Sequence, residues 1–140
     1  MEKIKLAWVD DTKRVVLCTY PPEEYSWDDL FDALKRQQAM IESSDLPAVD
    51  VIVDVQNSSW LPKGGTLLTG IRKLKEFQHR RQGETVIVGA RGFVASMAMV
   101  ASKLIRPGKQ GMYFANDMDQ AQKLLKQFDE RRQTEKKAVS

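Results

Sequence analysis

The chain has 140 residues, enough for one domain with a substantial core but too few for two ordinary domains. Hydrophobic residues make up 42%, charged residues 29% and the formal net charge is +3, a balance typical of soluble globular proteins rather than disordered or fibrous ones. No apolar run is long enough to span a membrane, and Met1-Glu2-Lys3 leads into a strand pattern without a signal-peptide core, so we expect a cytoplasmic protein.

The first part of the chain predicts a hairpin followed by a helix. Alternating apolar residues predict an edge strand over residues 4–8, and a more apolar run predicts its partner over residues 15–20, ended by Pro21-Pro22. Ser26 is a favourable helix N-cap with two aspartates in the first turn, and the apolar stripe that follows continues to about Ser43.

The rest of the chain alternates strands with helices. A buried-type strand at 49–54 precedes a helical stripe through Phe77, which we expect Gln82-Gly83 to close, because glycine is the usual residue after a helix. A strand at 85–88, a helix over about 93–104 and a strand at 112–114 follow, and Asp117 with Gln120 predicts the cap of a last helix.

The predicted order is therefore ββαβαβαβα. It indicates an α/β fold with a mostly parallel five-stranded sheet, an antiparallel first strand and four main helices. We expect the domain to span residues 1–128, and residues 129–140 to form a basic, disordered tail after a frayed helix end.

The residue types available for catalysis are few. His79 is the only histidine, at an expected helix end, where we expect it to be solvated or to face the helix dipole. Cys18 lies in an apolar run and should pack as a small hydrophobic residue. Asp54, at a strand end, is expected to cap the next loop. The sequence thus predicts no catalytic residue, metal site or cofactor.

Glycines near basic residues give a weak indication of anion binding at two strand-to-helix loops. Backbone N–H groups at such a loop can hold an anion, although tight turning of the chain also explains the glycines. The candidate residues are Lys63, Gly64, Gly65, Arg91 and Gly92. The basic runs at 72–81 and 131–137 lack an ordered set of stacking aromatics, so nucleic acid is not an expected partner.

The element order, the loop from Asp54 to Gly70 and the closing segment Tyr113-Phe114-Ala115-Asn116-Asp117-Met118-Asp119-Gln120-Ala121 resemble the STAS domain and its SpoIIAA-like relatives. The resemblance extends from about Ile4 to Phe128. It implies a non-enzymatic protein-interaction module of a bacterial-type regulatory system, typified by anti-sigma factor antagonists, that binds a partner protein through this loop and the helix after it.

The resemblance also implies which residues would contact the partner, and it exposes one departure. Regulatory members carry an Asp-Ser pair with a phosphorylatable serine where this chain has Pro62-Lys63, so we expect no phosphorylation at the helix start. The two large apolar residues of the loop, Trp60 and Leu61, either anchor a partner or fold back onto the sheet. The expected partner-binding residues are Ser58, Ser59, Trp60, Leu61, Lys63 and Thr66.

A second interpretation is a Sec14-type carrier of an apolar small molecule such as a lipid. Its cavity beside the sheet would be lined by Trp60, Leu61, Phe93, Met97 and Met99, although residues of these types at helical spacing also form ordinary core. A small hydrolase or transferase is a third alternative. The sequence leaves open whether the protein forms a homodimer.

Overall fold

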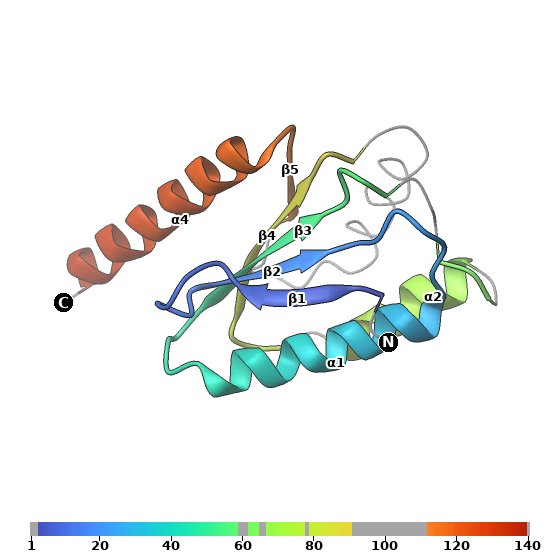
Figure 1. Ribbon diagram of the computed structural model, residues 1–140. Coiled ribbons are helices and arrows are strands. Elements are labelled where there is room, and N and C mark those ends of the chain that lie inside the picture. Colours follow the sequence, from blue (N-terminus) through green and yellow to red (C-terminus); the bar gives the residue numbers. More distant parts are fainter. Residues whose placement is uncertain (1–2, 59–61, 65–66, 78, 91–111, 140) are drawn as a thin grey trace.

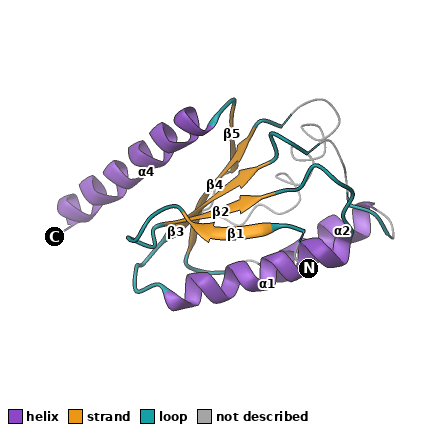
Figure 2. Cartoon of the chain, in the orientation of Figure 1, coloured by secondary structure: helices purple, strands orange, loops and turns teal. Residues whose placement is uncertain are grey.

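The computed structural model describes residues 3–58, 62–64, 67–77, 79–90 and 112–139, with the backbone alone at 67, 68, 71, 75 and 135–139. Figure 1 shows one twisted sheet with helices on both of its faces, and Figure 2 separates the strands from the loops that join them. The elements, in chain order, are β1 (Lys5–Trp8), β2 (Val15–Thr19), α1 (Trp27–Ser43), β3 (Val49–Asp54), α2 (Leu67–Lys73), the 3₁₀ turn η1 (Leu74–Phe77), β4 (Gln82–Val88), β5 (Met112–Ala115) and α4 (Met118–Val139).

The predicted five-stranded mixed sheet is confirmed. The strands lie in the order β1-β2-β3-β4-β5, β1 pairs antiparallel with β2, and the other neighbours are parallel. The carboxyl ends of the four parallel strands therefore meet at one edge, which includes the loop after β3.

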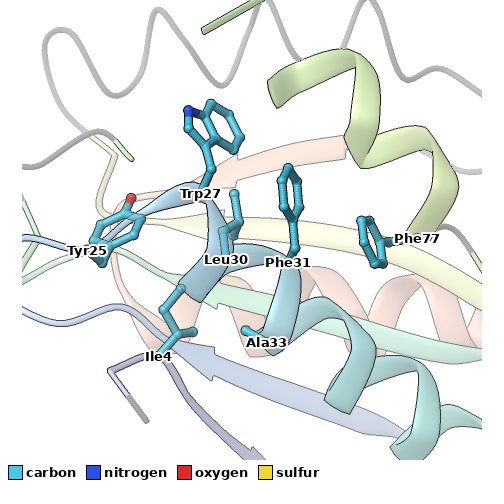
Figure 3. Packing of buried hydrophobic residues seen from close by; sticks show 7 residues of the cluster. All are labelled: Ile4, Tyr25, Trp27, Leu30, Phe31, Ala33 and Phe77. Atoms are coloured by element: carbon cyan, nitrogen blue, oxygen red, sulfur yellow. The ribbon is translucent and has the colours of Figure 1, made fainter. Parts of the chain in front are cut away.

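Alternate residues of each strand point to opposite faces, and each face has its own core. On the α1 face, Val49 and Val51 of β3 pack in one cluster with Ile41 of α1. On the α4 face, Ile52 packs in another with Leu125 of α4. At the amino end of α1, aromatic rings extend the first core, as Figure 3 shows for Trp27, Phe31 and Phe77.

The expected end of the second helix is wrong. Helix α2 ends at Lys73 and passes into η1, while Gln82 and Gly83 belong to β4, which begins three residues before the predicted strand. The strand starts there because it pairs with the start of β3, through Val49 opposite Gln82. Gly83 is needed in the strand, since a Cβ at this position would collide with the Asp50 carboxylate and the Arg132 guanidinium.

The last helix is longer than expected. Asp117 caps α4 as predicted, since its Oδ1 accepts from the Gln120 N–H at 2.8 Å. The helix then continues past Phe128 to Val139, through the segment expected to be a disordered tail. The helix predicted at 93–104 lies outside the described residues.

Candidate functional site

The carboxyl edge of the sheet is closed by backbone hydrogen bonds that continue the strand pairing. Tyr20 N–H donates to the Asp54 carbonyl at 3.0 Å, and Val55 N–H donates to the Val88 carbonyl at 3.0 Å. The Asp54 side chain caps the loop as predicted, because its Oδ1 accepts from both the backbone N–H (3.0 Å) and the side-chain amide (3.1 Å) of Gln56. Asp54 is thus engaged in shaping the loop.

The glycine at the end of β4 has a conformational role. Gly89 has φ of +76°, and a Cβ there would collide with Gln56. Its N–H donates to the Ala115 carbonyl at 2.9 Å. Tight turning therefore accounts for Gly89, while Arg91 and Gly92, the candidate anion-binding residues that follow it, lie outside the described residues.

Lys63, in the loop after β3, is joined to the start of α1 by backbone hydrogen bonds and an ion pair. Its N–H donates to the Tyr25 carbonyl and its carbonyl accepts from the Trp27 N–H, both at 3.0 Å, which makes a parallel bridge between Lys63 and Ser26. Its ammonium group also forms an ion pair with Glu24. The sequence suggested that the Lys63 ammonium binds an anion from outside the protein. In the structure this ammonium is instead paired with a carboxylate of the same chain. We name this set of contacts between Lys63 and residues 24–27 the clasp.

The clasp attaches to a well-formed helix N-terminus. As predicted, Ser26 caps α1: its Oγ accepts from the Asp29 N–H at 3.1 Å, and its own N–H donates to Asp29 Oδ2 at 2.8 Å. The hydrogen bond from the Ser26 N–H is the main cause of the lowered pKa of Asp29.

Of the other residues predicted to bind a partner, an anion or an apolar ligand, the structure describes only some. Ser58 N–H donates to the Val55 carbonyl at 3.1 Å, and its buried Oγ has no hydrogen-bond partner within the described part of the chain. Gly64 is exposed with φ of +95°, and a Cβ added there would have open space. Ser59, Trp60, Leu61, Gly65 and Thr66 lie outside the described residues, as do Phe93, Met97 and Met99.

A second site, which sequence reasoning missed, lies at the opposite end of the sheet. A groove of about 580 Å³ opens on the α4 face, between the β1–β2 turn, the segment leading into β3, and α4. Asp50 is 4% exposed at its inner wall. Its Oδ2 accepts from Arg132 Nη1 at 3.1 Å, and its Oδ1 accepts from Arg132 Nη2 and, at 2.8 Å, from the Glu84 N–H. The hydrogen bond to Asp50 raises the pKa of Arg132, although partial burial opposes it.

A second ion pair crosses the same groove nearer to solvent. Arg14, after the β1–β2 turn, donates from Nη1 to Asp129 Oδ2 of α4 at 2.9 Å. The one signal in the sequence was the position of Asp50 on its strand, on the same face as Ile52 and between buried valines. The partner could not be found from spacing, because Arg132 is 82 residues away.

His79 is half-buried, and Cys18 is buried in the core. Of the two expectations for His79, solvation is wrong and the helix-dipole contact stays a prediction: its side chain is 10% exposed, Nδ1 accepts from the Arg81 N–H at 3.0 Å, and Nε2 faces Glu42 Oε1 at 2.6 Å. Cys18 packs in the core as predicted and contacts Gln37 Oε1 at 3.1 Å, and burial raises the pKa of its thiol to about 12.

Within the described ranges, no group of three or more His, Cys, Asp or Glu residues is arranged to hold a metal ion. None of the described helices combines the length and apolar character needed to cross a membrane. In comparisons with known proteins, the chain matches no family model, no curated protein and no solved structure.

Proposed function

We propose that this chain is a non-enzymatic, STAS-like protein-interaction module of a bacterial-type regulatory system. Its partner-binding surface is the segment from Ser58 to Lys63 with the start of α2. The parallel strands that converge on this edge support the proposal, because α/β folds usually carry their function in the loops at the carboxyl ends of the strands.

The observation that carries the proposal is the clasp. In the family that the sequence resembles, a phosphorylatable serine at this position switches partner binding, and here the position holds Lys63. Its backbone is bonded on both sides to residues 25 and 27, and its ammonium is paired with Glu24. Lys63 held in this way has one fixed position from which to contact a partner, so we propose constitutive binding without a phosphorylation switch.

Affinity purification from the native cell tests the proposal, with the full chain as bait and partners quantified by mass spectrometry. The variant Lys63→Glu removes the ion pair and should abolish recovery of a specific partner. Lys123→Glu is the matched control, because Lys123 is an exposed lysine of α4, remote from the clasp. Binding measured with the purified partner must give the same ranking.

The double variant Glu24→Lys/Lys63→Glu separates shape from charge. It rebuilds the ion pair with reversed polarity, so it should restore the fold of the clasp. Restored binding would mean that the partner recognises the shape of the loop, whereas binding still lost would mean that the partner recognises the lysine charge. Unchanged binding in Lys63→Glu, or native protein stoichiometrically phosphorylated on Ser58, would refute the proposal.

A further inference from the structure

The groove on the α4 face has the size and lining of a small-molecule site. Its volume of about 580 Å³ lies within the ~300–1,000 Å³ typical of ligand pockets. Apolar side chains from three separate parts of the chain line it, namely Val9, Val15, Leu46, Ala48, Ile52 and Leu125. Ile52 and Leu125 are buried and belong to the core of this face, so the floor of the groove is fixed by packing.

The walls of the groove are also held in place. Helix α4 forms one wall, and two ion pairs tie it to the strands across the groove: Arg132 with Asp50 at the inner side, and Arg14 with Asp129 nearer to solvent. A pocket that is formed before the ligand arrives requires little ordering when the ligand binds.

Of the charged side chains that line the groove, one basic side chain is available to bind a ligand. Three basic and three acidic side chains line it. Two of each sign form the ion pairs, and Asp10 already accepts hydrogen bonds from the backbone and hydroxyl of Thr12. Lys126 on α4, which also lines the groove, has neither an ion pair nor a hydrogen bond to any of the residues that the structure describes.

We propose that this groove binds a small amphipathic anion: a molecule with an apolar body, held against the half-buried side chains of Val15 and Leu46, and a single carboxylate held by the Lys126 ammonium. The site is separate from the clasp. It lies on the other face and at the other end of the sheet, so it does not depend on the function proposed above.

NMR titration of the ¹⁵N-labelled full chain tests this site. The probe is sodium decanoate below its micelle concentration, and decyltrimethylammonium, which has the same apolar chain and the opposite charge, is the control ligand. Decanoate should shift the backbone amides of Val15, Ile52 and Leu125 and saturate at one molecule per chain. The cation should bind at least about tenfold more weakly, because it loses the charge-assisted contact.

Two charge reversals on the same helix make the test specific. Lys126→Glu should weaken decanoate binding by about tenfold or more, while Lys123→Glu, an exposed lysine outside the groove, should change it less than about twofold. Both positions are exposed, so both variants should fold. Equal binding by the two variants, shifts centred at the clasp, or shifts that never saturate would each overturn the proposal.

Discussion

The two faces of the sheet are stabilised in different ways. On the α1 face, rings stack in series: Trp27 lies 5.7 Å from Phe31, and Phe31 lies 5.3 Å from Phe77, measured between ring centroids. On the α4 face, the apolar core is joined by a carboxylate that is 4% exposed and an arginine that neutralises it. Apolar packing dominates the core of the first face, whereas the core of the second also contains one buried, long-range ion pair.

This difference affects how specifically each face is built. Apolar packing is non-directional, so several arrangements of rings would bury similar areas. A buried ion pair tolerates few geometries, because either charge left without its partner is strongly destabilising. We therefore expect the pair between Asp50 and Arg132 to fix where α4 lies on the sheet, and Gly83 leaves the space that the pair requires.

The largest effect should come from the ring stack. Phe31→Ala removes the central ring, which is 8% exposed, and should lower the free energy of unfolding by about 3–5 kcal/mol. Urea unfolding followed by circular dichroism measures the change. Lys35→Ala, an exposed position on the same helix, is the control and should change stability by less than about 0.5 kcal/mol. Similar losses in both variants would show that the stack does not support the α1 face.

A smaller loss is expected from breaking the buried ion pair. Arg132→Met leaves the Asp50 carboxylate without its cation and should lower the free energy of unfolding by on the order of 2 kcal/mol. This is below the ~3–5 kcal/mol of a fully buried pair, because 32% of the arginine side chain is exposed. Urea unfolding again measures the loss.

Adding Asp50→Asn to Arg132→Met should recover part of that stability. The amide is neutral and still offers an oxygen to the Glu84 N–H, which donates to Asp50 Oδ1 at 2.8 Å. If the double variant were less stable than Arg132→Met alone, the comparison of the two faces would have to be revised, since the cost would then come from lost packing rather than from an unpaired charge.

Local sequence signals predicted much of this fold. The strand patterns gave the mixed sheet, and Ser26 followed by two aspartates gave the start of α1, because these signals act between neighbours in the sequence. The prediction that Gly83 ends a helix was wrong, because glycine occurs both after helices and where a side chain would collide with its neighbours. Only the distant pair of Asp50 and Arg132 shows that the second reason applies here.

The candidate sites were less predictable, because they depend on contacts between segments that are distant in the sequence. The loop after β3 was located from the strand before it, but the ion pair of Lys63 with Glu24 joins segments 39 residues apart. The groove on the α4 face requires three segments to meet, and no local pattern encodes their meeting. The length of α4 also depends on tertiary contacts such as those of Arg132, which lies in the segment expected to be disordered.

The N-terminal cap of α1 should contribute about 0.3–1 kcal/mol, and this contribution should depend on pH. The Ser26 N–H holds the pKa of Asp29 below its ordinary value of 3.8 in the folded protein. The stabilisation is therefore present above pH 3.8 and is lost as the pH falls through the folded pKa. Urea unfolding should show that Asp29→Asn is less stable than the unchanged protein at neutral pH, with the gap closing as the pH falls below the folded pKa of Asp29. A gap that persisted in acid would mean that the charge is not what stabilises this end of the α1 face.

The smallest effect is expected for the solvent-exposed pair on the α4 face, and it tests whether burial or pairing makes the difference there. Arg14 and Asp129 are 49% and 38% exposed, whereas the Asp50 side chain is 5% exposed. A double-mutant cycle of Arg14→Ala and Asp129→Ala should give a coupling of about 0.2–1 kcal/mol. This coupling should fall further in ~1 M salt, where charges are screened within about 3 Å. The same cycle with Arg132→Ala and Asp50→Ala should give a larger coupling that salt reduces less, because water and ions reach this pair poorly. Equal couplings, or equal sensitivity to salt, would mean that desolvation does not set the inner pair apart, and α4 would then be held on the sheet by apolar packing, as α1 is on the other face.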